Sequence, residues 1–201
     1  MAILTMFGCR RVKCSLVALL LLACTVPAFL PLSAQEMDVP VRMQVPILLK
    51  VISFDRHLHT RAPREVVVGV LMQGGYRASV VARDEAVEVL TAPATSVDGL
   101  PVRVVIFDLD RQDIREVFTN RPLTHLYVTP LRAIDIRELA AHARTARVTT
   151  MTGVTEQLSG GLSLGVGLRD GRPKILVNVG ASRAEGADLS AELLKLAELI
   201  P

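Results

Sequence analysis

Residues 65–72 read EVVVGVLM, and this stretch decides the fold class because, apart from Glu65 and one glycine, it is entirely apolar. An apolar run of this length, rich in valine, predicts a strand whose two faces are both buried. Outward from it, three further strands are expected at residues 100–108 (LPVRVVIFD), 123–128 (LTHLYV) and 148–152 (VTTMT). They too combine β-branched with other apolar residues, as buried strands do.

Helices are predicted between these strands. In one of them the apolar residues Val80, Val81, Val87 and Leu90 recur at roughly helical spacing among charged residues. Strands that alternate with helices need crossover connections, and these produce a mainly parallel sheet. The other expected elements are an extended lead-in at 35–46, a short helix at 45–52, a loop at 56–64 and helices at 76–90, 111–119 and 134–146.

The end of the chain has a different pattern. Two apolar runs at 162–168 and 173–179 flank the Asp170-Gly171 pair, which is typical of a tight hairpin turn. Residues 188–199 then repeat leucines at helical spacing and predict a closing helix capped by Asp188. The sequence therefore predicts an α/β fold, a Rossmann-like and mainly parallel sheet flanked by helices, ending in a β-hairpin and a C-terminal helix.

The first 34 residues have the pattern of an export signal. A basic stretch (Arg10, Arg11 and Lys13) precedes an apolar core at 16–22, and small residues end at Ala34. An alternative is a lipoprotein signal, because 21–24 read LLAC and acylation of Cys24 would anchor the chain to a membrane. We favour cleavage after Ala34, because the apolar stretch continues past Cys24 to Leu32, and this predicts a soluble periplasmic protein.

Cleavage after Ala34 changes the charge and the cysteine content of the chain. It removes three of the 23 Lys and Arg residues and none of the 20 Asp and Glu residues, which leaves 20 of each. This balance and the 3% aromatic content disfavour a nucleic-acid partner. It also removes Cys9, Cys14 and Cys24, so no disulfide is expected. The expected organisation is a signal peptide at 1–34, an N-terminal extension with the first helix at 35–64, and a single α/β domain at 65–201 continuous with 45–64.

The most specific stretch is 160–197, GGLSLGVGLRDGRPKILVNVGASRAEGADLSAELLKLA. The residue types point to structural roles, such as close backbone approach at paired glycines and a turn at an asparagine that ends a strand. The stretch resembles the YfiR-type family of small periplasmic α/β proteins. The matching residues are Gly160, Gly161, Asn178, Ala181, Arg183, Gly186, Ser190, Leu193, Leu194, Leu196 and Ala197.

The resemblance implies regulation and not catalysis. Members of this family bind the periplasmic part of an inner-membrane diguanylate cyclase and hold it inactive, and an outer-membrane lipoprotein can sequester them. It thus implies a link to cyclic-di-GMP, biofilm and exopolysaccharide, with a cyclase, a lipoprotein or a second copy of the chain as partners. The sequence departs from the family at Phe54-Asp55-Arg56-His57, where members often carry Trp-Pro. The closing helix is the expected contact surface.

No motif predicts a catalytic centre, a cofactor or a metal. His57 and His59 share one side of an extended segment, but a zinc site needs three or four ligands. Asp108 and Asp110 follow a strand without the Lys or Ser/Thr partner of a phosphoryl-transfer site, and Asp110 is better explained as a helix cap. Gly74-Gly75 precedes a helix whose start could bind an anion, but a tight turn is the favoured explanation.

Two other functions remain open at this stage. A small-ligand or envelope-stress sensor would use the crevice at the carboxyl edge of the sheet, near residues 73–76 and 108–112. A hydrolase with a dispersed site is the third and most remote hypothesis, because catalytic triads assemble in space and not in sequence.

If the chain is exported and cleaved after Ala34, the mature protein has one defined mass. The protein recovered from the periplasm should begin at Gln35, which intact-mass spectrometry measures directly. A mass that begins at Cys24 and includes acyl chains would show the lipoprotein form instead.

Overall fold

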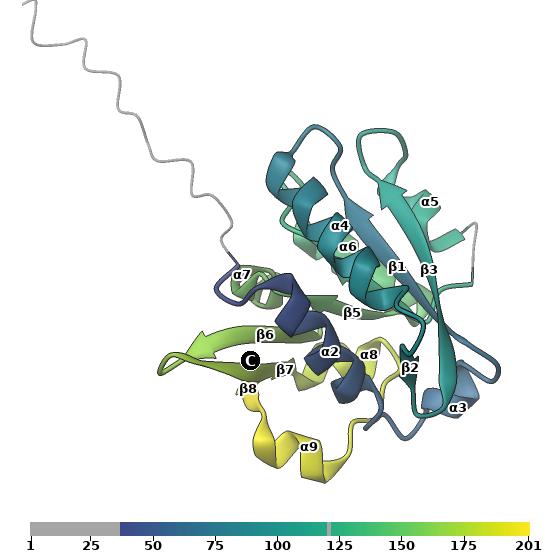
Figure 1. Ribbon diagram of the computed structural model, residues 1–201, viewed down its shortest axis with the longest axis vertical. Coiled ribbons are helices and arrows are strands. Elements are labelled where there is room, and N and C mark those ends of the chain that lie inside the picture. The colour runs from purple at the N-terminus through teal and green to yellow at the C-terminus, as the bar shows by residue number, and fades with distance from the viewer. Residues whose placement is uncertain (1–36, 120–121) are drawn as a thin grey trace, which may run out of the picture. The chain divides into compact units, whose positions relative to one another are not determined.

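A computed structural model describes residues 37–119 and 122–201 (Figure 1). The expected signal peptide and its three cysteines lie outside the described residues. Within these two ranges, no helix is long and apolar enough to cross a membrane.

An eight-stranded sheet, in the order β2-β3-β1-β4-β5-β6-β7-β8, forms the middle layer. The five central strands β3, β1, β4, β5 and β6 run parallel, while β2 is antiparallel to β3 and β7 to β6. The strands are β1 (Val66–Met72), β2 (Ser96–Val97), β3 (Leu100–Asp108), β4 (His125–Val128), β5 (Thr149–Thr152), β6 (Leu164–Arg169), β7 (Arg172–Asn178) and β8 (Glu198–Ile200).

Helices cover both faces of the sheet (Figure 1). Helices α2 and α4 pack on one face, and α5, α6 and α7 pack on the other. The helices are α2 (Val41–Ile52), α3 (Leu58–Arg61), α4 (Arg77–Leu90), α5 (Ile114–Thr119), α6 (Ile136–Ala146), α7 (Thr155–Ser159), α8 (Val179–Ala184) and α9 (Ala191–Leu196).

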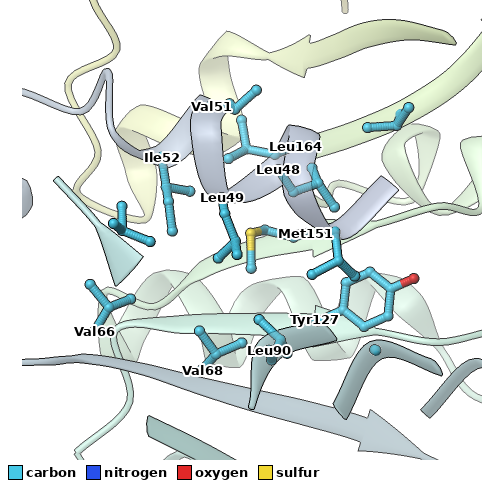
Figure 2. Packing of buried hydrophobic residues seen from close by; sticks show 14 of the residues in the cluster. Leu48, Leu49, Val51, Ile52, Val66, Val68, Leu90, Tyr127, Met151 and Leu164 are labelled. Carbon is cyan, nitrogen blue, oxygen red and sulfur yellow. The ribbon is translucent and has the colours of Figure 1, made fainter. Parts of the chain in front are cut away.

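Strand β1 separates two hydrophobic cores, as its sequence predicts. All seven of its residues are buried. Val66 and Val68 pack with α2 and α4, together with Tyr127 and Met151, as Figure 2 shows. Val67 and Leu71 point to the opposite core, beneath α5, α6 and α7. The alternation follows from the two-residue period of a strand, which sends neighbouring side chains to opposite faces.

The predicted fold class is confirmed, and the corrections concern individual elements. Helix α2 begins at Val41, within the expected extended lead-in, because Pro40 is its N-cap and its carbonyl accepts from Gln44 N at 3.0 Å. Pro46 lies inside the helix and lacks the N–H that would donate to Arg42 O. The expected loop at 56–64 contains α3. In α4 the buried face consists of Ser79, Ala82, Ala86 and Leu90, while Val81 is 47% exposed. The small side chains of this face allow α4 to lie close to α2 and β1.

The largest correction lies at the end of the chain, where a single helix at 188–199 was expected. Asn178 accepts a hydrogen bond from Ala181 N at 2.9 Å and caps α8, which the sequence did not predict. Ser190, and not Asp188, caps α9 by accepting from Leu193 N at 3.3 Å. After α9 the chain returns to the sheet as β8, parallel to β7. Pairing with an open strand edge thus overrides the helical spacing of the last leucines.

A buried charge pair ties the front of the chain to its end. The side chain of Asp55 is 2% exposed and accepts from Arg61 Nη1 at 2.9 Å. The same carboxylate accepts from the backbone N–H groups of His57 at 2.9 Å and Asp188 at 2.8 Å. Beside it, Asp55 forms an antiparallel bridge with Leu189. The short segment after α2 is therefore held against the α8–α9 connection by charge-assisted hydrogen bonds.

Arg61 extends this connection to the central strands. Its Nη2 donates to Arg147 O at 2.9 Å, to Thr149 Oγ1 at 2.8 Å and to Thr124 O at 3.3 Å. These acceptors lie at the amino ends of β4 and β5. One guanidinium thus joins α3 to the sheet and to the end of α6.

Removal of Arg61 should destabilise the fold strongly. In Arg61→Ala the buried Asp55 carboxylate loses its cation, and breaking a buried pair on one side costs about 3–5 kcal/mol. Arg56→Ala is the matched control, because Arg56 meets Asp188 at 3.4 Å with a side chain that is 59% exposed. Exposed pairs contribute about 1 kcal/mol or less. Urea unfolding followed by circular dichroism measures both, and equal losses would contradict this account.

Candidate functional site

The end of the chain surrounds a buried carboxylate that the sequence analysis did not identify. Glu185 follows α8 and is fully buried. Its carboxylate accepts from Thr150 N at 2.8 Å, from Thr150 Oγ1 at 2.8 Å and from Ser163 Oγ. Ser163 N in turn donates to Thr150 Oγ1 at 2.9 Å. The cluster joins α8 to β5 and to the start of β6 through one side chain.

Burial raises the pKa of Glu185 to about 7, against an ordinary value of 4.5. The hydrogen bonds from Ser163 and Thr150 oppose this shift because they favour the charged form, and the positive charge of Arg144 opposes it weakly. No cation forms an ion pair with Glu185 among the described residues. The carboxyl group therefore changes its charge near neutral pH inside the protein.

The family-motif residues occupy three kinds of position. Gly161 and Gly186 have φ values of +106° and +91°, which favour glycine. A Cβ atom at Gly160 would lie 2.6 Å from Ile136 Cγ2, so a side chain there would collide with α6. Asn178 and Ser190 cap α8 and α9. The buried members are Ala181 and Leu193, the partly buried ones are Leu194 and Ala197, and the exposed ones are Arg183 and Leu196.

Arg183 lies in a groove at the amino edge of the parallel strands, where the front segment meets the α8–α9 connection. The groove consists of two adjoining hollows of about 430 and 380 Å³, which share His57, Arg147 and Gly186. The side chains of Arg147 and Arg183 are exposed and have no ion-pair partner in the described part of the chain. This groove, hereafter the amino-edge groove, is therefore suited to an acidic group.

A second exposed feature lies on α9 and β8, at the C-terminal end of the chain. Leu196 is 64% exposed at the end of α9, and Leu199 is 55% exposed in β8. Between them Glu198 forms a bidentate pair with Arg169 of β6, with distances of 2.9 Å from Nε and 3.0 Å from Nη2. We call Leu196, Glu198 and Leu199 the α9–β8 surface. Leu196 and Leu199 are the two most exposed large apolar side chains among the described residues.

At the carboxyl edge, the glycine pair is closed to outside anions. Gly74 N donates to Asp108 Oδ1 at 2.9 Å, and Gly75 N donates to Asp110. The chain's own carboxylates thus occupy the donors that an anion would use. Asp110 was predicted to cap the helix that follows it, and this prediction is wrong. Helix α5 begins only at Ile114, and Asp113 accepts from Arg115 N at 2.8 Å.

Next to this turn lies an apolar groove of about 620 Å³. The start of α2 and the start of α4 form its walls, with Val81 and Tyr76 among the lining residues. The guanidinium of Arg132 lies 4.1 Å from the centre of the Tyr76 ring. The crevice expected at 73–76 is thus replaced by a mostly apolar groove beside it, whose charged lining residues are Arg77, Glu85 and Arg132.

The structure separates the histidines from one another. His57 Nδ1 lies 3.4 Å from Gly186 O, while His59 Nε2 lies 2.7 Å from Asp98 Oδ2, because the segment is a helix and not extended as expected. His125 is packed, and burial followed by the nearby charge of Arg61 lowers its pKa to about 3. His142 stacks on Phe118. Across residues 37–119 and 122–201, no three His, Cys, Asp or Glu side chains gather as a metal would require.

The fold is a doubly wound α/β sheet. Arg147 and Arg183, unpaired among the described residues, line its amino-edge groove, and Leu196 and Leu199 are exposed on the α9–β8 surface. The sequence model of the YfiR/HmsC-like family matches residues 68–198. The chain belongs to this family, as the motif at 160–197 predicted. Members of the family are periplasmic regulators rather than enzymes, and membership supports a periplasmic regulatory role. The match begins after Phe54–His57, where the sequence departs from the family.

Solved structures share the fold at low sequence identity. The ABC domain in complex with L-Trp from Streptococcus pneumonia has a TM-score of 0.55 and 11% identity over 81% of this chain. A conserved domain protein from Vibrio cholerae O1 biovar eltor has a TM-score of 0.55 and 12% identity over 80% of this chain. The chain spans 62% and 60% of the length of these two proteins. No curated protein matches the chain in sequence.

The sequence analysis missed Glu185 and Arg147 for different reasons. Glu185 stands between Ala184 and Gly186 in the family motif, and a charged residue next to a glycine is typical of an exposed turn. Its burial depends on Thr150 and Ser163, which are 35 and 22 residues away. Arg147 ends α6 with a φ of +54°, a left-handed cap position that the sequence signals weakly in the absence of glycine.

The raised pKa of Glu185 predicts a pH dependence of stability. Between pH about 4.5 and 7 the folded chain keeps the proton that the unfolded chain has lost, so the free energy of unfolding falls as pH rises. The full effect is about 3 kcal/mol. Glu185→Gln should unfold at a higher temperature than the parent chain near pH 8, and the two curves should converge near pH 5.

Thermal unfolding over this pH range measures the difference. Glu116→Gln, at an exposed position of α5, is the control and should follow the parent chain throughout. A constant offset of Glu185→Gln at every pH would show that the carboxyl group does not titrate in this window.

Proposed function

We propose that the chain is a periplasmic repressor of an inner-membrane diguanylate cyclase, and that it links envelope state to cyclic-di-GMP, biofilm and exopolysaccharide output. Family membership carries the proposal. The structure is compatible with it, because it exposes the cations Arg147 and Arg183, which are unpaired within the described residues, and the apolar Leu196 and Leu199. Such groups recognise a protein surface.

The contact surface that we propose is the α9–β8 surface together with the amino-edge groove. Leu196 and Leu199 supply apolar area, and covering a leucine side chain yields about 1.5–3 kcal/mol if it is buried completely. Arg147 and Arg183 supply charge at the rim, where arginine is enriched in interfaces. The surface thus fits a partner that offers an apolar patch beside an acidic one. This replaces the longer closing helix that the sequence predicted as the contact surface.

Repression would work by population shift. The cyclase's periplasmic domain exchanges between an active and an inactive arrangement, and a partner that binds the inactive one more tightly holds it there. The ratio of the two affinities limits the effect, and a 100-fold ratio corresponds to about 2.7 kcal/mol. An outer-membrane lipoprotein that covers the same surface would release the cyclase by competition.

A second candidate function is the sensing of a small ligand. The apolar groove beside Tyr76 favours it, because small-ligand sites are concave and mostly apolar with few polar groups. The likeness to the ABC domain in complex with L-Trp, a ligand-bound protein, supports the same idea. In this case the chain would act without a cyclase partner.

Deletion of the gene should raise cyclic-di-GMP in the parent cell, and the intact gene should restore the low level. Complementation with Leu196→Glu should fail, because a charged side chain at the centre of a covered patch weakens binding by about tenfold or more. Met43→Glu is the matched control, since Met43 is 50% exposed on α2 and lies outside the proposed surface. Mass spectrometry of cell extracts measures the nucleotide.

Two outcomes count against the proposal. Unchanged cyclic-di-GMP on deletion and on overexpression would remove the cyclase link and favour the ligand sensor. If deletion raises cyclic-di-GMP as expected but Leu196→Glu complements fully, the regulatory role is supported. The contact surface must then lie elsewhere on the protein.

A further inference from the structure

The parallel sheet reverses its strand order between β1 and β4. From β1 the chain goes to β3 on one side, and it then crosses to β4 on the other side, with β5 beyond β4. The connection after β1 leads through α4 and the connection after β4 through α6, and these helices cover opposite faces of the sheet. The two connections therefore part at the carboxyl ends of β1 and β4. Open α/β sheets bind small ligands at such a switch point.

The apolar groove beside Tyr76 lies at this switch point. Among its lining residues, Tyr76 and Arg77 follow β1 and Arg132 follows β4. Its volume of about 620 Å³ falls within the range of small-ligand pockets, which is roughly 300–1,000 Å³. The groove therefore has the place and the size of a ligand site. It lies on the β4 side of β1, and not on the β3 side at 108–112.

Arg132 is held in a fixed position at one end of the groove. Its backbone N donates to Gln73 Oε1 at 2.6 Å, and Gln73 Nε2 donates to its carbonyl oxygen at 3.1 Å. Its guanidinium lies 4.1 Å from the centre of the Tyr76 ring, so the ring covers one face of the group. The N–H donors lie in the guanidinium plane, and none of them bonds to another described residue. Arg132 thus offers an oriented set of donors to an acidic group.

The rest of the groove changes character along α4. Arg77, Val81 and Glu85 follow one another at intervals of four residues, so they share one face of this helix. Arg77 begins α4 and directly follows Tyr76, on whose ring Arg132 lies. Glu85 lies two turns further on, about 12 Å along the helix axis. The groove therefore has a cationic end, an apolar middle and a carboxylate at its far end.

We propose that this groove binds a medium-chain carboxylate, with the carboxylate at Arg132 and the alkyl chain along the apolar surface between α2 and α4. The donors of Arg132 and the positive charge of Arg77 match the acidic head. The alkyl chain covers Val81, which is otherwise 47% exposed, and removal of this apolar surface from water favours binding.

The spacing of the charges selects this class of ligand. An α-amino acid carries its ammonium and its carboxylate on one carbon, whereas Arg77 and Glu85 are about 12 Å apart along the helix, so no such molecule pairs with both ends. A dicarboxylate of this length would bring its second anion to Glu85, which is unfavourable. A neutral alcohol would leave the cationic end unmatched. One acidic head on one apolar chain fits the whole groove.

The inference names a ligand class for the ligand-sensing candidate and rests on that candidate function. The cyclase proposal uses other residues, Arg147, Arg183, Leu196 and Leu199, and its test measures cyclic-di-GMP in cells. The test of the groove measures binding to the purified protein. Failure of one therefore leaves the other standing.

Isothermal titration calorimetry with decanoate, kept below its micelle concentration, tests the proposal. The parent chain should bind decanoate saturably at one site. Arg132→Gln should raise the decanoate Kd about tenfold, because a charge-assisted hydrogen bond is lost. Arg137→Gln is the matched control, since Arg137 is an exposed arginine of α6 outside the groove, and it should bind like the parent chain. Circular dichroism checks that both variants fold.

Decanol, which has the same alkyl chain without the charge, separates the head from the tail. It should bind the parent chain more weakly than decanoate, and Arg132→Gln should leave its Kd unchanged. Val81→Asn should weaken both compounds, whereas Met43→Asn, at an exposed position of α2 outside the groove, should weaken neither.

Four results would overturn the proposal. Absence of saturable decanoate binding, or equal effects of Arg132→Gln and Arg137→Gln, would remove the site. Equal affinities of the parent chain for decanol and decanoate would remove the role of the acidic head. Tighter binding of L-leucine than of decanoate would replace the ligand class with an amino acid.

Discussion

The charge pair between Asp55 and Arg61 holds together parts of the chain that the sheet alone leaves unconnected. Strand pairing and the alternation of buried side chains determine where the central strands lie. The segment after α2 and the α8–α9 connection lie at the amino edge, beyond the ends of these strands. Asp55 uses both carboxylate oxygens to join them, and Arg61 carries the connection to β4 and β5. A buried pair of this kind contributes little net stability but is costly to break on one side. Its main effect is to determine where the front segment sits.

That placement forms the amino-edge groove, which is part of the contact surface that we propose. The amino-edge groove exists because the front segment and the α8–α9 connection are held side by side, with His57 and Gly186 common to both hollows. Glu185 fixes α8 from beneath, through Thr150 and Ser163. A proton taken up or lost by Glu185 therefore acts at the end of α8, the helix that carries Arg183. The two buried carboxylates, Asp55 and Glu185, thus hold in place the segments that line the proposed contact surface.

Sequence reasoning was strongest where a single physical pattern decides the structure. Three predictions of this kind are confirmed: the buried valine strand β1, the helix α6 and the Asp-Gly turn between β6 and β7. Each depends on neighbours within a few residues. It was weakest where local and long-range preferences compete. The leucines of the closing helix fit a helical period through Leu199, yet β8 forms there because the edge of β7 offers hydrogen bonds. In α4 the spacing of Val80, Val81, Val87 and Leu90 predicted the buried face. Of these only Leu90 is fully buried, and the small residues Ser79, Ala82 and Ala86 complete the face.

The candidate site divides in the same way. The sequence by itself determined the fold class, the family motif with its paired glycines, and the family to which the chain belongs. These follow from residue types at short spacing, where backbone conformation and packing are local. Only the tertiary structure decided that Glu185 is buried, that Arg61 serves Asp55, and that Arg147 and Arg183 share a groove. Each of these depends on contacts between residues far apart in the chain, and neither burial nor charge pairing can be read from spacing when the partner lies on another element.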